Sequence, residues 1–306
     1  MARWMVVTHG GTDSKPEESD GCERAARAAI EALQHGEDAL AAAVAAVTVL
    51  EADGRYGAGK GSPLAMDGRT IQMDAGVMDT QGRLGGVASI TNVVHAVQVA
   101  RRVADTPHVL LVGEGANAFA RRIGLEQQVE PTDKVRHDFA EYVKKLQDAG
   151  NPQGDADDTE SDAGRALVKQ FWNYDVPWQQ VMDQFGHGTV GAVVRADRQF
   201  AVAVSTGGSM PALLGRVADI GIVGTGFYAG PHAAVGCSGI GEHNVRHHTA
   251  LQVHQWVAGG MPLREALQRG MDLTPPGLQS ALIGVSFDDV ALASRAPMAH
   301  AVRREG

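Results

Sequence analysis

Cysteines and long hydrophobic runs are both scarce in this sequence of 306 residues. Only Cys22 and Cys237 are present, which excludes a framework of disulfide bonds and is typical of a reducing compartment. The longest apolar run, residues 39–50, is too short to cross a bilayer, and we interpret it as a helix buried on most sides. The first residues lack the hydrophobic stretch of a secretory signal. We therefore expect a cytoplasmic protein with no membrane partner.

Basic residues are also comparatively few, with 27 Lys and Arg against 36 Asp and Glu and a formal charge of −9. No Lys/Arg cluster stands out, so the sequence excludes the basic footprint that nucleic-acid binding requires. The hydrophobic fraction of 44% and charged fraction of 21% are those of an ordinary globular protein. Glycine is abundant at 38 residues, which indicates many positions of positive φ or close backbone approach.

The pattern of hydrophobic residues predicts strands and helices in blocks. The first half of the chain predicts a strand at 4–9, helices at 23–33 and from Asp38 to about Leu50, short strands within 54–91, a helix at 92–104, a strand at 108–113, a helix from about 115 and an amphipathic helix at 134–147. The second half predicts strands at 189–194, 200–205, 220–228 and 233–239, helices at 242–258 and 262–271, and a hairpin at 281–295. This order favours an α+β fold with a largely antiparallel sheet and helices on its outer faces.

One segment has a different composition from the rest. Residues 151–164 read NPQGDADDTESDAG and are polar and strongly acidic, which predicts a disordered linker or a solvated surface loop.

The strands after this segment carry two threonines in register. If the turn is centred between Asp197 and Arg198, antiparallel pairing matches residues whose numbers sum to 395, and this pairs Thr189 with Thr206. Their Cβ atoms would then lie roughly 4.5–5.5 Å apart on one face. A pair of threonines is also an ordinary feature of sheets. Gly188 precedes Thr189, and cleavage of the bond between them would give Thr189 a free α-amine with a pKa of about 7.7–8.0, able to act as base for its own hydroxyl.

Several segments resemble the plant-type L-asparaginase and isoaspartyl peptidase family. They are THGG, GAGKGSPLAMDGRTIQMDAGVMD, GGVASITNVVHAVQVARRV, TPHVLLVGEGANAFA, GTVGAVV, AVSTGG, LLGRVAD and GTGFYA, in order along nearly the whole chain except about 131–187. The resemblance implies a four-layer αββα sandwich of the N-terminal nucleophile hydrolases. It also implies one structural domain that cleaves itself into an α-subunit, 1–188, whose acidic linker spans about 150–187, and a β-subunit, 189–306. A dimer of cleaved αβ units and a structural Na⁺ or K⁺ held by backbone carbonyls near 50–61 are implied as well, without any other metal or cofactor.

The resemblance also assigns roles to individual residues. Thr189 is the nucleophile, and Thr206 positions it. Arg216 and Asp219 bind the carboxylate and amine of an amino-acid head, whereas by position alone they read more simply as a salt bridge. Ser238, where the family has threonine, and Gly239 N–H form the oxyanion hole, and Gly239 and Gly241 help to hold the substrate head; without the resemblance this segment is a structural turn.

Two departures from the family pattern concern specificity. The family usually has asparagine where this chain has Gly57, and the segment YAGPHAAVGCSG is one residue shorter and places Pro231 and His232 near the pocket. Both indicate that substrate preference has drifted.

Other motifs give weaker alternatives. His243 and His247, with His248 adjacent, have zinc-like spacing but lack the HExxH order and an obvious third ligand. GEGANA after an apolar strand suggests a dinucleotide-binding oxidoreductase, although no acidic residue ends a following strand. YGAGKG at 56–61 lacks the end of a P-loop.

We therefore expect a threonine amidohydrolase that acts on β-aspartyl peptides or on the side-chain amide of L-asparagine. An amidase of the same family acting on another amino-acid amide, such as a glycosylasparagine, is the alternative. The partner is a small-molecule substrate, not a nucleic acid.

Overall fold

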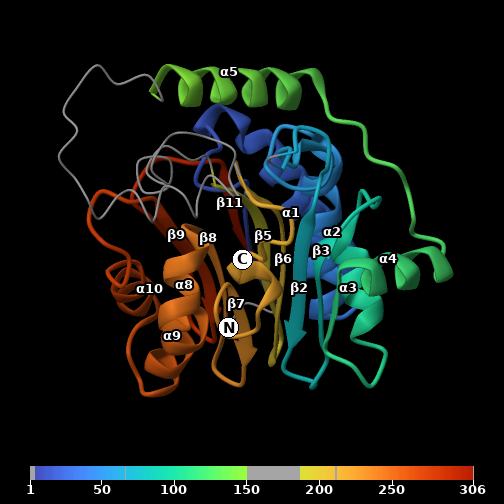
Figure 1. Cartoon of the computed structure of the whole chain (residues 1–306). Helices are drawn as coiled ribbons and strands as arrows, with labels where there is room; N and C mark the ends of the chain where they lie inside the picture. The colour runs from blue at the N-terminus through green and yellow to red at the C-terminus, as the bar shows by residue number, and fades with distance from the viewer. Residues whose placement is uncertain (1–3, 66, 150–186, 211, 306) are drawn as a thin grey trace.

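The structure is a computed structural model that describes residues 4–65, 67–149, 187–210 and 212–305. The predicted linker at 151–164 lies outside the described residues. Eleven strands in this part of the chain form two sheets (Figure 1). The sheet of seven strands has the order β11-β1-β5-β6-β2-β3-β4, and the sheet of four has the order β10-β9-β8-β7. The fold is therefore α+β, as predicted.

The strands of the larger sheet pair antiparallel except for β3 and β4, which are parallel. Its strands are β1 (Trp4–His9), β2 (Met73–Asp79), β3 (Leu84–Ile90), β4 (Leu110–Val112), β5 (His187–Ala196), β6 (Gln199–Ser209) and β11 (His300–Arg304). The smaller, wholly antiparallel sheet contains β7 (Phe227–Gly230), β8 (Ala233–Gly239), β9 (Ser280–Ser286) and β10 (Val290–Ser294).

The two sheets face each other across one hydrophobic cluster. Val7, Val193 and Phe200 from the larger sheet pack against Phe227 and Ile283 from the smaller one, and all five are buried. Burial of such side chains contributes about 1.5–3 kcal/mol each. This contact fixes the position of β8 relative to β5 and β6, where the candidate site lies.

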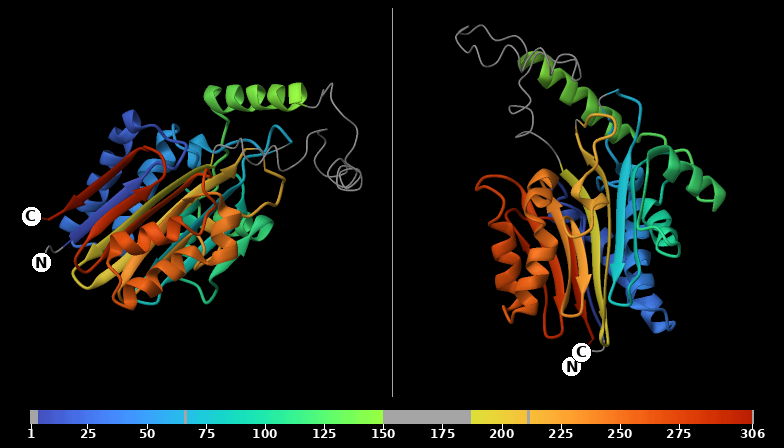
Figure 2. Two further views of the ribbon diagram at one scale, coloured as in Figure 1. Left: turned by 90° about the vertical axis from the view of Figure 1, so that its left-hand side faces the viewer. Right: turned by 60° about the horizontal axis from the view of Figure 1, so that its bottom comes forward.

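Helices cover the outer faces of both sheets (Figure 2). The α-helices are α1 (Ser19–Gln34), α2 (Ala39–Asp53), α3 (Ala96–Val103), α4 (Gly113–Arg122), α5 (Asp133–Ala149), α8 (Gly241–His247), α9 (Thr249–Ala258) and α10 (Leu263–Met271). Short 3₁₀ helices are η1 (Pro16–Glu18), η2 (Gly59–Gly61) and η3 (Asp219–Gly221). None of the helices in these described ranges combines the length and hydrophobicity needed to span a membrane.

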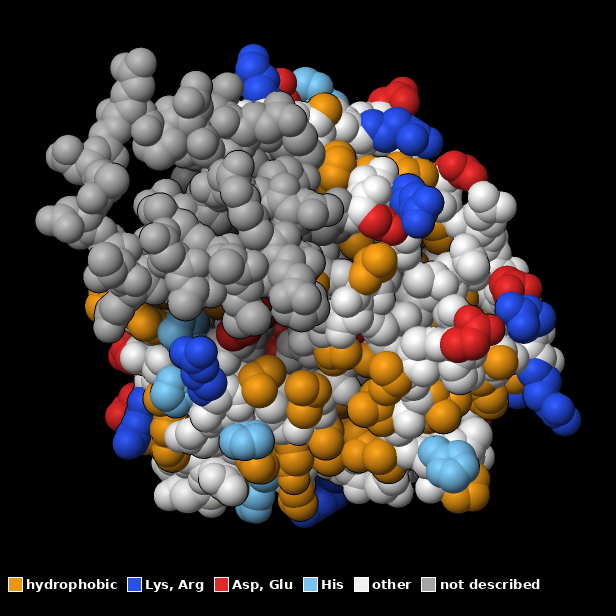
Figure 3. Space-filling model, in the orientation of Figure 1, with side chains coloured by type: hydrophobic (Ala, Val, Ile, Leu, Met, Phe, Trp, Pro, Cys, Tyr) orange, Lys and Arg blue, Asp and Glu red, His pale blue; other side chains and the backbone are white. Residues whose placement is uncertain are grey.

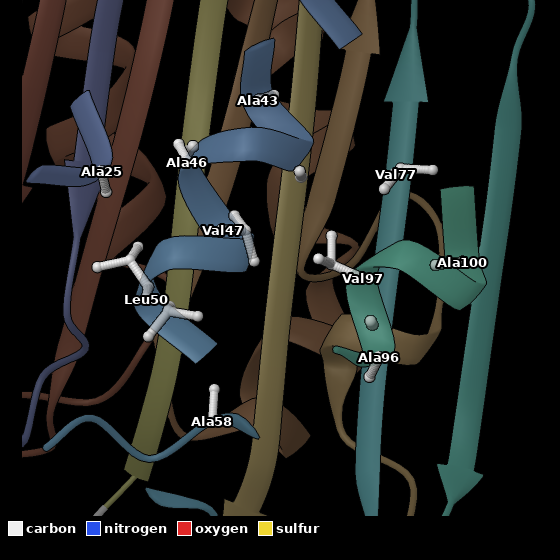
Figure 4. Packing of buried hydrophobic residues seen from close by; sticks show 14 of the residues in the cluster. Ala25, Ala43, Ala46, Val47, Leu50, Ala58, Val77, Ala96, Val97 and Ala100 are labelled. Carbon is white, nitrogen blue, oxygen red and sulfur yellow. The ribbon is translucent and has the colours of Figure 1, made fainter. Parts of the chain in front are cut away.

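The apolar helix α2 is buried against the larger sheet, as predicted for residues 39–50. Figure 4 shows Ala46, Val47 and Leu50 of α2 beside the strands, with Val97 of α3 nearby. The helix begins where the Asp38 side chain accepts a hydrogen bond of 2.9 Å from the Ala41 N–H, and it ends at Gly54, whose φ is +82°. An apolar surface on most sides suits a helix packed between a sheet and α1.

Two predicted elements differ from the observed ones. The helix expected at 242–258 is interrupted at His248, which has a φ of +48° and so cannot continue a helix. The strand expected at 220–228 begins only at Phe227, because Asp219–Gly221 form η3 and Gly224 has a φ of +86°. The short strand β11, which pairs with β1, was not predicted.

Candidate active site

The hairpin of β5 and β6 has the predicted register. Ala196 pairs with Gln199 at the turn, and Thr189 pairs with Thr206, so that the sum of 395 is confirmed. The Thr189 hydroxyl donates to the Thr206 hydroxyl oxygen at 3.4 Å. Just beyond this pair the register shifts, and Gly188 lies opposite Gly208. This irregularity of the strand falls on the bond that the sequence predicts to be cleaved.

The Thr206 hydroxyl is the centre of a small hydrogen-bond network. It donates to the Gly188 carbonyl oxygen at 2.5 Å and accepts from the Gly208 N–H at 2.9 Å. Thr206 is buried. A single side chain therefore contacts both the candidate nucleophile and the carbonyl that this nucleophile would attack.

The backbone around Gly188 is packed without room for side chains. A Cβ atom on Gly188 would lie 2.3 Å from the Gly57 Cα, and a Cβ atom on Gly57 would lie 2.4 Å from the Gly188 Cα. Both distances are far shorter than any real contact. The glycine at 57, a departure from the family pattern, therefore lies directly against the candidate cleavage site, and its carbonyl accepts from the Gly207 N–H at 2.8 Å.

Arg216 forms an ion pair that the sequence did not predict. Its Nε and Nη2 atoms donate to the Glu242 carboxylate at 2.9–3.1 Å. Among the described residues it forms no ion pair with Asp219, so the simple salt bridge considered for GRVAD is wrong. Its Nη1 faces Gly208, where an added Cβ atom would lie 3.2 Å away. This edge of the guanidinium is turned toward the threonine pair.

Asp219 is a buried carboxylate beside Arg216. It accepts from the Asn244 side chain at 2.8 Å, and burial raises its pKa to about 6 despite the lowering effects of Asn244 and Arg216. A Cβ atom on Gly241 would lie 2.7 Å from the Asp219 Oδ1 and 3.2 Å from the Arg216 Nη2. Gly241 therefore allows both charged groups to approach the backbone at the start of α8.

Ser238 and Gly239 end β8 close to the turn after β1. The Ser238 hydroxyl accepts from the Thr12 N–H at 3.2 Å. Gly239 has a φ of +123°, and a side chain there would meet the Gln279 carbonyl. A glycine is required for the backbone to turn at this point.

These elements line a small cavity that is partly open to solvent. Its lining contains Thr189, Thr206, Gly208, Ser209, Arg216, Ala218, Asp219 and Gly239. Five of the seven predicted catalytic and substrate-binding residues thus meet at one cavity, while Ser238 and Gly241 adjoin lining residues without belonging to the lining. A larger groove between α1, α2 and α3 contains none of the predicted site residues in its lining.

Three polar residues next to the cavity were not predicted. Glu242 binds Arg216 and Asn244 binds Asp219, both from α8. Asp74 of β2 is buried and accepts from the Ser89 and Ala218 N–H groups at 2.8 and 2.6 Å, which fixes the backbone next to Asp219. The only sequence signal for Glu242 and Asn244 is their position three and five residues after Gly239.

The shortened segment does not place Pro231 and His232 near the pocket, so this prediction is wrong. They form the exposed turn between β7 and β8, whereas Ser238 and Gly239 lie at the opposite end of β8. A strand of this length separates its ends by roughly 20 Å.

The alternative motifs lie outside the cavity. Within the described ranges, no group of three or more His, Cys, Asp or Glu side chains could hold a metal ion. GEGANA spans the start of α4, which follows the edge strand β4, and β4 belongs to a mainly antiparallel sheet rather than a doubly wound parallel one. The last three residues of the GAGKG segment form η2, in which Gly59 packs against Glu51 and Gly61 against the Tyr56 carbonyl.

Comparison with known proteins gives consistent matches. A family model described as asparaginase matches residues 2–286. The chain is 32% identical over 294 residues to a plant-type L-asparaginase of Thermococcus kodakarensis, covering 93% of this chain and 89% of the relative. It is 36% identical over 249 residues to an isoaspartyl peptidase/L-asparaginase of Danio rerio (78% and 71% covered) and 33% identical over 316 residues to that of Mus musculus (99% and 88% covered).

Proposed function

Because the chain belongs to the asparaginase family of hydrolases, we propose that it is a self-cleaving threonine amidohydrolase for β-aspartyl peptides and the side-chain amide of L-asparagine. The observation that carries the proposal is the meeting of the Thr189–Thr206 hydroxyl pair with Arg216 and Asp219 at one cavity. A hydroxyl nucleophile and a pair of opposite charges suit an amide substrate that carries an amino-acid head.

Self-cleavage begins with attack of the Thr189 Oγ1 on the Gly188 carbonyl carbon. The resulting N→O acyl shift breaks the bond to the Thr189 nitrogen, so that the amine becomes free and an ester joins Gly188 to the Thr189 hydroxyl. Water then hydrolyses the ester to the Gly188 carboxylate and the free Thr189 hydroxyl. The hydrogen bond from Thr206 to the Gly188 carbonyl oxygen polarises the carbonyl under attack. We propose that the products are an α-subunit, 1–188, and a β-subunit, 189–306, which remain one structural domain.

In turnover, the Thr189 hydroxyl attacks the amide carbonyl of the substrate, and its own amine accepts the proton. The leaving amine or ammonia takes up that proton, and water hydrolyses the acyl ester to restore Thr189. Ser238 Oγ and the Gly239 N–H are proposed to stabilise the oxyanion. The Ser238 hydroxyl accepts from Thr12, so its own proton stays available for this purpose.

The amino-acid head of the substrate is proposed to lie between Arg216 and Asp219. Glu242 occupies the Nε–Nη2 side of Arg216, which leaves Nη1 to bind the substrate α-carboxylate. Asp219 accepts from the α-ammonium group, and Gly239 and Gly241 leave space for the head.

The proposed molecule is a four-layer αββα sandwich that assembles as a dimer of cleaved αβ units. The packing of helices on the outer faces of two facing sheets supports the layers. Hydrophobic side chains gather on the lower part of the face in Figure 3, and exposed Val109, Leu110 and Val112 on and beside the edge strand β4 support an interface between copies. The two free, buried cysteines support a cytoplasmic location.

We propose that backbone carbonyls in the turn that leads into η2 would hold the structural Na⁺ or K⁺ that the resemblance implies. The carbonyl oxygens of Tyr56 and Gly54 both pack against Gly61, where an added Cβ atom would lie 2.1 and 2.7 Å from them, so a glycine lets these two carbonyl groups lie close together. Hard oxygen ligands suit alkali cations. These residues would hold the ion, whose role would be to fix the turn beside Gly57.

The first experiment is intact mass spectrometry of the purified protein, combined with assays on β-aspartyl dipeptides, L-asparagine and glycosylasparagine. We expect fragments that end at Gly188 and begin at Thr189, and release of aspartate from the first two substrates. Thr189→Ala should remain whole and inactive. Full activity in a wholly uncleaved protein would refute the mechanism, and activity on glycosylasparagine alone would favour the other amidase.

The second experiment tests substrate recognition with Arg216→Lys. The variant keeps the positive charge but loses the planar guanidinium. We expect kcat/KM to fall at least tenfold for substrates with a free α-carboxylate and much less for analogues with this group amidated. If the ratio of kcat/KM between the free and the amidated substrates is the same in the variant as in wild type, Arg216 does not bind the substrate carboxylate.

A further inference from the structure

The turn after β1 brings a carboxylate next to Thr189. Gly11 has a φ of +101°, and a Cβ atom placed on it would lie 2.9 Å from the Thr189 nitrogen and 2.8 Å from the Asp13 Oδ1. The Asp13 Oδ1 and the Thr189 nitrogen can therefore be no further apart than the sum of these two distances. Because Gly11 has no side chain, nothing from this residue separates the Asp13 carboxylate from the backbone of Thr189.

The other oxygen of Asp13 faces Gly188. A Cβ atom on Gly188 would lie 3.1 Å from the Asp13 Oδ2 and 2.3 Å from the Gly57 Cα. Asp13 and Gly57 therefore border the same space beside the candidate cleavage site. The resemblance stated above places an asparagine at position 57, and in this chain the nearest polar side chain at that space belongs to Asp13 instead.

Among the residues that the structure describes, Asp13 has no ion-pair partner that would occupy its carboxylate. Within the described ranges it forms no ion pair; the charged groups whose fields reach it are Lys134 and Asp138 of α5, which pair with each other at 2.7 Å, and Glu18 of η1. The Asp13 side chain is exposed in the structure. It is not one of the residues that line the substrate cavity.

We propose that Asp13 is a positioning residue for the N-terminal amine of Thr189, which its Oδ1 binds once the bond to Gly188 is broken. The inference rests on the proposed self-cleavage. The Asp13 carboxylate would then lie beside the space that Gly57 leaves without a side chain.

The negative charge of Asp13 acts on both new chain ends that cleavage produces. Addition of water to the Gly188–Thr189 bond yields a carboxylate on Gly188 and an ammonium group on Thr189. Asp13 attracts the ammonium and repels the Gly188 carboxylate, so it retains the catalytic end and favours departure of the other. Binding the ammonium also raises the pKa of the Thr189 amine, which must be neutral to take the hydroxyl proton.

The test compares the pH dependence of kcat in wild type, Asp13→Asn and Glu17→Gln. Glu17→Gln is the matched control, because it removes the same charge from an exposed residue of the same segment. We expect Asp13→Asn to cleave itself. The acidic limb of its pH–rate profile should move to lower pH by about 0.5–1 unit, since the amine loses a neighbouring negative charge. The plateau should also fall about tenfold, and the control should match wild type.

Two results would overturn the proposal. A cleaved Asp13→Asn with an unchanged acidic limb would show that the carboxylate does not interact with the amine. A folded variant that stays whole would assign Asp13 to the cleavage step instead. Circular dichroism checks the fold, and Asp13→Ser repeats the measurement if the asparagine variant does not fold. Failure of the proposed function is seen separately, in an active wild type that is not cleaved.

Discussion

At the scale of single residues, the Thr206 hydroxyl has the most contacts to the reacting groups. Thr206→Val keeps the shape of the side chain and the β-branched preference for a strand, but removes the bonds to Thr189 and Gly188. We expect the fold to survive, self-cleavage to slow, and kcat of the cleaved enzyme to fall about 10²–10³-fold, the usual cost of one positioned hydrogen bond to the reacting group.

Thr206→Ser is the control for this prediction. It restores the hydroxyl without the methyl group and should recover most of the turnover. Steady-state kinetics on L-asparagine and a time course of cleavage by mass spectrometry measure both effects. Near-normal turnover in Thr206→Val would show that the cross-strand hydroxyl does not take part.

Asp219 gives a prediction about pH. Its carboxyl has a pKa of about 6 because it is buried, so it is ionised at pH 7 and becomes protonated as the pH falls through 6. A neutral carboxyl cannot balance the charge of the substrate ammonium. We therefore expect KM to rise several-fold between pH 7 and pH 5, with less change in kcat.

An analogue without the α-amine separates Asp219 from the other titrating groups. Asp74 also has a pKa raised to about 6 by burial, but it is engaged by backbone N–H groups. The KM of the deamino analogue should be nearly independent of pH over this range. Equal pH dependence for both substrates would contradict the assignment of Asp219 to the ammonium.

At the scale of elements, the contact between the turn at Gly57 and the start of β5 shapes the cleavage site. Gly57→Ala would place a Cβ atom 2.4 Å from the Gly188 Cα, and the neighbouring backbone would have to shift. We expect self-cleavage to slow at least tenfold, because the alignment of the Thr189 hydroxyl and the Gly188 carbonyl would be lost.

Gly115→Ala is the matched control, because nothing lies within 4 Å of an added Cβ atom in α4. It should cleave at the wild-type rate and be neutral or slightly stabilised. The fraction of whole chain over time, read by intact mass spectrometry, distinguishes the variants. Rapid cleavage of Gly57→Ala would show that the tight contact has no bearing on the reaction.

The elements differ in how far the sequence could predict them. The hairpin of β5 and β6 was predictable residue by residue because its turn is local and its register follows from the turn. Asp13 was not, because its place beside Thr189 depends on the pairing of β1 with β5, which is long-range. Glu242 was missed for the same reason, and the break at His248 has no glycine or proline to mark it.

At the scale of the whole molecule, the hydrophobic contact between the two sheets holds together the two parts of the candidate site. Thr189 and Thr206 lie on the larger sheet, and Ser238 and Gly239 lie on the smaller one. Phe227 is 1% exposed, and its ring occupies the space above Gly76, where an added Cβ atom would lie within 2.3 Å of it. We expect Phe227→Ala to lower the free energy of unfolding by about 3–5 kcal/mol. Val223→Ala, at a side chain 40% exposed, should change it by only about 0.5 kcal/mol.

Urea denaturation of the two variants and of wild type measures this difference. The variants should show similar cleavage before denaturation, since Phe227 is not one of the residues that line the cavity. A loss in Phe227→Ala no greater than in the surface control would show that the contact between the sheets contributes little to stability. The α+β class followed from the order of elements, but which faces meet depends on side chains of both sheets at once.

The first and last strands of the chain lie side by side, with Met5 opposite Arg304 and the Glu305 N–H donating to the Trp4 carbonyl at 3.1 Å (Figure 2). A short peptide could therefore join the two ends, and the chain could be opened elsewhere. A circular permutant opened between Gly188 and Thr189 would be translated with Thr189 next to its initiator methionine. Removal of that methionine would expose the threonine amine directly, so that hydrolysis could be studied in a protein that never has to cut itself.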